Sequence, residues 1–160
     1  MNINAAAKLL YKDYRGPTLN VTEDALMKDI KVSPGLAKVQ FNQSVLEAFS
    51  TLCPPPRLSS LNVNTLLGFV AEADVVLDSR GQPLLVQEFS NSFGNSQPQK
   101  PLPEGGHRLS LITATFQECL LGGQLSGVTS LNAKLLKSLG YKVMVVNYTD
   151  WQVSDKLVTR

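Results

Sequence analysis

The stretch GVTSLNAKLLKSLGYKVMVVNYTDW, residues 127–151, decides the class of fold. Its leucines recur at helical spacing and share one face of a helix. Ser130 or Thr129 can cap the start of this helix, and Gly140 suits the position after its last turn. The apolar run KVMVVNY that follows is typical of a buried strand. The stretch therefore predicts a helix that leads directly into a strand.

Apolar runs further upstream predict the other strands of a sheet. GFVAEADVVLD, residues 68–78, alternates well enough for a strand, and the turn SRGQPL leads to LLVQEF, residues 84–89, so we expect a hairpin. A long polar loop at residues 91–106 separates the hairpin from a third strand, RLSLITATF. Together with the helix and strand of residues 127–151, these runs predict an α/β sheet whose last connection is a right-handed crossover.

The first third of the chain predicts three helices. Residues 3–11 are rich in alanine, a second helix starts at Thr22 and stops before Pro34, and residues 41–53 carry an apolar stripe. The CPPPR segment then forms a stiff extended linker. We expect these helices to cover one face of the sheet or to form a small subdomain.

Composition limits the classes of protein to which the chain can belong. Its 160 residues, 43% of them hydrophobic, fit one globular domain with a small helical appendage. The formal net charge of +2 neither demands nor excludes RNA, although the segment from Gly105 onward holds 6 basic and 3 acidic residues. The two cysteines lack zinc-site spacing, so we expect buried, reduced thiols. No apolar run approaches the roughly 18 residues of a membrane span, and we expect no membrane partner.

The block LLKSLGYKVMVVNYTDW resembles the signature of the RAP domain, an RNA-binding module. In that family a leucine-rich helix leads to a glycine and an aromatic residue, then to a hydrophobic strand and to an acidic residue beside tryptophan. The matching residues here are Leu135, Leu136, Leu139, Gly140, Tyr141, Val143, Val145, Val146, Asp150 and Trp151. Upstream, AEADVVLDSRGQPLLVQEF and YRGPTL are similar to segments of the mitochondrial proteins that contain FAST kinase domains. The resemblance covers nearly the whole chain.

This resemblance implies a protein of the mitochondrial matrix that acts in the processing, stability or translation of mitochondrial RNA. It implies mitochondrial transcripts as partners, along with protein partners of RNA processing, and no cofactor. Residues 1–56 would be helices of the second FAST region, and residues 57–160 the RAP domain with its restriction-endonuclease-like, PD-(D/E)XK-type α/β core. Kinase activity is not implied, because LLGGQLSG lacks the spacing of a phosphate-binding glycine loop.

A nuclease fold raises the question of metal-dependent cleavage. That chemistry needs an acidic residue on one strand, and an acidic residue and a lysine two positions apart on the next strand. The carboxylates hold Mg²⁺, and the lysine positions the attacking water. On the first strand Glu72, Asp74 and Asp78 are expected to share a face. These three acids can be a solvated strand end, a vestigial metal site or an RNA contact. The next strand offers only hydroxyls and apolar groups in the polar places, with Glu118 just past it. We therefore predict no catalytic residue and no metal site, with those four acids as weak candidates.

Basic and aromatic residues around the last helix and strand are the predicted RNA contacts. They are Arg108, Lys134, Lys137, Lys142, Tyr148 and Trp151. Lysines suit phosphate contact, and the aromatic rings can stack on unpaired bases. The alternatives are that the lysines are simply solvated and that Trp151 packs under a C-terminal helix. The chain is thus predicted to bind RNA without cleaving it; the alternatives are a degenerate nuclease fold that docks a protein, and a divergent metal-dependent endoribonuclease.

Overall fold

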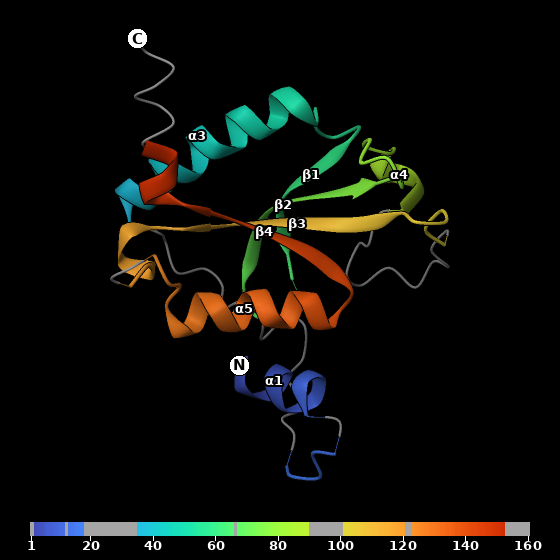
Figure 1. Cartoon of the computed structure of the whole chain (residues 1–160). Helices are drawn as coiled ribbons and strands as arrows, with labels where there is room; N and C mark the ends of the chain where they lie inside the picture. The colour runs from blue at the N-terminus through green and yellow to red at the C-terminus, as the bar shows by residue number, and fades with distance from the viewer. Residues whose placement is uncertain are drawn as a thin grey trace.

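A four-stranded mixed sheet lies at the centre of the molecule, with its strands in the order β1-β2-β3-β4 (Figure 1). The computed structural model describes residues 2–11, 13–17, 35–65, 67–89, 101–120 and 123–152. The strands are β1 (Ser59–Asn64), β2 (Val70–Leu77), β3 (His107–Ala114) and β4 (Tyr141–Asn147). The helices are α1 (Asn2–Leu10), α3 (Leu36–Leu52), α4 (Val86–Phe89) and α5 (Gly127–Ser138), and a 3-10 turn, η1 (Phe116–Glu118), follows β3.

The connections follow from the directions of the strands. Strands β1, β2 and β3 form an antiparallel run, whereas β4 pairs with β3 in parallel. A parallel pair needs a crossover between its strands, and α5 supplies it. The helix and strand expected in residues 127–151 and the mixed α/β class are therefore confirmed.

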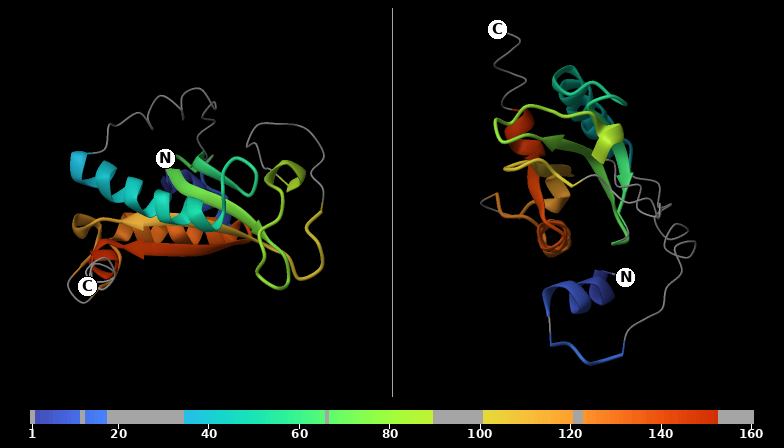
Figure 2. Two further views of the ribbon diagram at one scale, coloured as in Figure 1. Left: turned by 90° about the horizontal axis from the view of Figure 1, so that it is seen from above. Right: turned by 90° about the vertical axis from the view of Figure 1, so that its right-hand side faces the viewer.

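Helices lie on both faces of the sheet (Figures 1 and 2), and an apolar cluster fills the space between helix and sheet on each face. Neighbouring residues of a strand point to opposite faces, so Leu111 packs with Phe41 and Val45 of α3, while Ile112 packs with Leu135 of α5. Helix α1 packs on the α5 side, where its apolar residues join the same cluster. The leading helices thus do not share one face, as the sequence suggested, because α1 packs against α5 and α3 against the strands.

One expectation about the strands is wrong, and one strand was not predicted. LLVQEF does not form the second half of a hairpin, because beyond the single bridge between Leu77 and Pro83 the chain turns into α4. Proline lacks an N–H for a strand ladder, and the amide of Val86 instead donates to the carbonyl oxygen of Arg57 at 2.9 Å. The strand that does pair with the other edge of β2 is β1, SSLNVN, which the sequence analysis did not identify.

The start of α5 also differs from the sequence expectation. Ser126, rather than Ser130 or Thr129, caps the helix, and its hydroxyl accepts a hydrogen bond from the Thr129 amide at 3.4 Å. Gly140 has a φ of +88°, as expected for the glycine after the last turn. The predicted helix that starts at Thr22 and the loop of residues 91–100 lie outside the described residues. Within the described part of the chain, no helix is long and apolar enough to cross a membrane.

Candidate nucleic-acid interface

A cavity of about 680 Å³ opens at the end of the sheet where β1 ends and β2 begins. Four asparagines line it, and they come from three different elements: Asn42 from α3, Asn62 and Asn64 from β1, and Asn132 from α5. The wall of the cavity also includes Lys38, Phe69, Glu72, Thr113, Glu118 and Thr129. We call this space the asparagine cavity. None of the four amides was identified from the sequence, because isolated asparagines in separate segments form no pattern along the chain.

Glu72 is a buried carboxyl group in the wall of the asparagine cavity, only 8% exposed. Its Oε2 accepts a hydrogen bond from the amide of Thr113 at 3.0 Å, and its Oε1 accepts one from the side-chain amide of Asn42 at 3.2 Å. The Thr113 hydroxyl lies 2.8 Å from Glu72 Oε1 and 2.8 Å from Asn42 Oδ1. Glu72 thereby ties β2 to β3 and α3.

The protonation of Glu72 follows from its surroundings. Burial raises the pKa of this carboxyl group, and the hydrogen bonds from Thr113 and the charge of Lys38 lower it, with a net increase. The Thr113 hydroxyl has one hydrogen and two acceptors within reach. When Glu72 is protonated it can donate to Thr113, which can then donate to Asn42, so the neutral form completes the network.

Lys38 and Glu118 form an ion pair in the wall of the cavity, with Nζ and Oε1 2.7 Å apart. The other carboxylate oxygen of Glu118 accepts hydrogen bonds from the amide and the hydroxyl of Thr115, both at 2.9 Å. Burial acts to raise the pKa of Glu118, but Lys38 and Thr115 together hold it below its usual value. Glu118 therefore serves as an ionised partner of Lys38 and as part of the capping box of η1.

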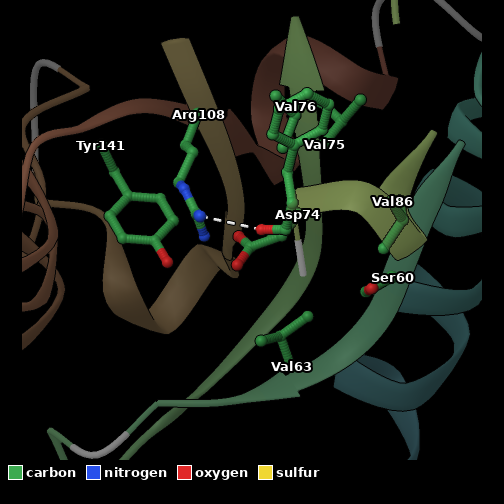
Figure 3. A pocket seen from close by; sticks show the side chains of 9 residues that line it. Ser60, Val63, Asp74, Val75, Val76, Val86, Arg108 and Tyr141 are labelled. Carbon is green, nitrogen blue, oxygen red and sulfur yellow. Dashed lines mark hydrogen bonds between the residues drawn. The ribbon is translucent and has the colours of Figure 1, made fainter. Parts of the chain in front are cut away.

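Asp74 belongs to a different and much smaller cavity, of about 40 Å³ (Figure 3). Its carboxyl group faces the guanidinium of Arg108, and the side chain of Tyr141 lies nearby (Figure 3). Arg108 also donates to the carbonyl oxygen of Phe89 at 2.8 Å. Burial raises the pKa of Asp74 to about 6, against the opposing effects of the Ser110 hydroxyl and the Arg108 charge.

The three acids of the first predicted strand are therefore not brought together. Asp78 follows β2 and accepts hydrogen bonds from the amides of Arg80 and Gln82 in the turn, both at 2.8 Å. The expected shared face is not kept, because the alternation of β2 is interrupted at Glu72: Ala71 packs in the cluster of α5, whereas Ala73 packs in the cluster of α3. Among the described residues, no group of three or more metal-ligating side chains is suited to hold a metal ion.

The predicted RNA contacts divide between the two layers. Lys134 and Lys137 are exposed on α5, and Lys142 is exposed on β4. Tyr148 and Trp151 instead pack into the cluster under α3. Helix α3 lies on the opposite side of the sheet from α5 (Figure 1). Lysines and aromatic rings thus do not form the single rim that their closeness in sequence suggested.

Both aromatic side chains are anchored to α3. The indole N–H of Trp151 donates to the hydroxyl of Ser44 at 2.9 Å, and the ring of Tyr148 meets that of Phe41 edge to face, with centroids 5.3 Å apart. Trp151 is thus packed, as the alternative expected, but against α3 rather than under a C-terminal helix. Arg108 is half-buried and engaged with Phe89 and Asp74.

Comparison with known proteins agrees with the motif resemblance. A family model described as FAST kinase-like protein, subdomain 2, matches residues 1–85. FAST kinase domain-containing protein 4 from Rattus norvegicus is 29% identical over 154 residues, and the Homo sapiens protein of the same name is 29% identical over 160 residues. Each match covers 94% of this chain but 24% of the relative, so the chain spans about a quarter of the length of these proteins.

No solved structure matches the chain. The family model covers more than half of the sequence, through α1, α3, β1 and β2. The chain therefore belongs to the family of FAST kinase-like proteins.

Proposed function

We propose that this chain is an RNA-binding module of a mitochondrial RNA processing or stability factor, and that it binds RNA without cleaving it. The observation that carries the proposal is the basic outer surface of α5, where Lys134 and Lys137 are exposed. Neither lysine forms a salt bridge within the described residues, so both ammonium groups are available to phosphates. The family relationship and the RAP-like signature support the same assignment and the mitochondrial matrix as its location.

Support for a restriction-endonuclease-like RAP core comes from the order of elements. A helix precedes three antiparallel strands, and a crossover helix then leads to a parallel fourth strand. We keep the division into residues 1–56, from the second FAST region, and residues 57–160, the RAP domain, as part of this proposal.

The surroundings of Glu72 argue against metal-dependent cleavage. A carboxylate that binds Mg²⁺ presents free oxygen lone pairs to the ion. Both oxygens of Glu72 already accept hydrogen bonds, and its nearest polar neighbour on β3 is the hydroxyl of Thr113 rather than a second acid. Lys38, the basic side chain of the cavity wall, is paired with Glu118. These side chains fit a binding surface better than a catalytic one.

RNA binding is tested by the salt dependence of affinity for a single-stranded oligonucleotide. We expect Lys134→Glu combined with Lys137→Glu to weaken binding at least tenfold, because two phosphate contacts become repulsive. The slope of log affinity against log salt should fall by about 0.7 for each lost contact. The matched control is Lys8→Glu combined with Arg80→Glu, which makes the same charge change at two exposed positions outside α5. An equal loss in the control would contradict a specific role for α5.

Cleavage is tested with the same oligonucleotide in the presence of Mg²⁺ or Mn²⁺. We expect the RNA to remain intact. Cutting that disappears in Glu72→Gln or Asp74→Ala would establish the endoribonuclease alternative. Binding too weak to measure would favour the alternative of a protein-docking module.

A further inference from the structure

We infer that the asparagine cavity receives one unpaired nucleotide of the bound RNA, with the base among the asparagines and its phosphate at Lys38. This inference rests on the proposed function and places a contact site that the α5 lysines do not include. The cavity volume of about 680 Å³ is within the usual range of small-ligand sites, about 300–1,000 Å³.

The side chains of the wall match the chemistry of a nucleobase. An asparagine amide carries both donors and an acceptor, the two kinds of group that alternate along the edge of a base. Asn42 already uses its amide on Glu72 and Thr113, so the exposed amide of Asn62 is the first contact expected for the base. The ring of Phe69 adds an aromatic surface, and Ile112 adds an apolar one. Proteins read RNA sequence mainly from unstacked single-stranded bases, held by stacking and by hydrogen bonds to their edges. The asparagine amides can hydrogen-bond to the edge of a base, and the ring of Phe69 can stack on its face.

The charges of the cavity place the phosphate at Lys38. Glu72 lies among Asn42 and Thr113, and as a buried acid it disfavours an anion next to it. Lys38 is a third exposed, so its ammonium group can meet a phosphate while it remains close to Glu118. Glu118 competes with that phosphate for Lys38, because both are anions.

Glu118 both pairs with Lys38 and completes the capping box of η1, and one substitution can separate these two roles. Glutamine at this position can still accept from Thr115 and complete the capping box, but it no longer neutralises Lys38. We expect Glu118→Gln to strengthen RNA binding about twofold to fivefold and to steepen its salt dependence by about one phosphate contact. A loss of affinity with the fold intact would overturn the assignment of Lys38.

Two further variants test the base contacts. Asn62 has a φ of +50°, a conformation that glycine adopts freely, so Asn62→Gly removes the amide without straining β1. Phe69→Leu keeps apolar bulk and removes the aromatic ring. Each should weaken single-stranded RNA binding about fivefold or more. The matched control, Gln43→Ala, removes an exposed amide of α3 outside the cavity and should bind as the wild type does.

The experiment is NMR of the side-chain amides of the whole chain, titrated with a single-stranded oligonucleotide and with a nucleoside monophosphate. We expect both to shift the amide signals of Asn62 and Asn132 and to leave Gln43 unchanged. RNA binding that leaves the cavity signals unmoved overturns this inference and leaves the proposed function standing. A response to the monophosphate without RNA binding supports a nucleotide site and overturns the proposed function. No response to either ligand overturns both.

Discussion

Two acidic residues of one strand, Glu72 and Asp74, show how strongly the surroundings of a residue decide its chemistry. They are two positions apart in β2, yet Glu72 hydrogen-bonds to α3 and β3, whereas Asp74 faces Arg108 in a separate cavity. Burial raises the pKa of both carboxyl groups, and their partners only partly oppose it. Both acids therefore reduce the stability of the folded state when they ionise.

Stability should depend on pH through Asp74. Its pKa is about 6 in the folded chain against 3.8 for an unperturbed aspartic acid, so the folded state binds its proton more tightly than the unfolded state does. The stabilisation from this proton is complete below pH 3.8 and is lost as the pH rises through 6. In magnitude it is on the order of 3 kcal/mol.

We therefore expect Asp74→Asn to gain stability relative to the wild type between about pH 4 and pH 7, because asparagine cannot ionise. Urea unfolding at several pH values measures this difference. Parallel pH profiles for the two proteins would contradict the assignment of Asp74 as a buried acid.

At the scale of the element, the two glycines at the ends of α5 differ in backbone conformation. Gly127 is its first residue, with no positive φ and no heavy atom within 4 Å of an added Cβ. Gly140 follows the helix with a φ of +88° and the same open space. Only the backbone conformation distinguishes them.

The same substitution should therefore act in opposite directions at these two positions. Gly127→Ala is expected to raise the free energy of unfolding by about 0.4–1 kcal/mol, since alanine loses less backbone entropy on folding. Gly140→Ala should lower it by about 1 kcal/mol, the order of the cost of placing a side chain in the left-handed region. Chemical denaturation of both variants measures the difference, and the same sign for both would show that the end of α5 does not hold this conformation.

At the scale of the whole molecule, the segment after β4 is joined to α3 across a large separation in sequence. Trp151 donates to Ser44, 107 positions earlier, and Tyr148 packs against Phe41. These contacts attach the last described turn to the helical layer that covers the sheet. Trp151 is the one tryptophan of the chain, so its fluorescence reports on this junction.

A double-mutant cycle tests the junction. Trp151→Phe and Ser44→Ala each remove the hydrogen bond between the two side chains, which should cost about 0.5–1.5 kcal/mol of stability. Trp151→Phe adds a packing loss, and Ser44→Ala also removes the hydrogen bond from the Ser44 hydroxyl to the Phe41 carbonyl oxygen. The double variant should cost less than the sum of the two, because they share one interaction. Additive losses in thermal or urea unfolding would show that the two side chains do not interact.

The candidate site was only partly predictable. Exposed lysines on α5 followed from helical spacing, since Lys134 and Lys137 fall outside the leucine face. The separation of these lysines from Tyr148 and Trp151 did not, because it depends on the side of the sheet to which the chain turns after β4. Strand β1 was missed because its run SSLNVN is short and mostly polar, and Leu61 and Val63 are its two apolar residues.

The order of residues was sufficient to predict the apolar elements, which are the helix and strand of residues 127–151 and the strands β2 and β3, and its motifs indicated the family. Only the tertiary structure decided which polar side chains meet. Asn42, Asn62 and Asn132 belong to three segments that share no local pattern, and they meet in one cavity because α3 and α5 both reach the end of the sheet where β1 ends and β2 begins. Local periodicity records which face of an element is buried, whereas a site between elements depends on packing, which the order of residues along the chain does not display.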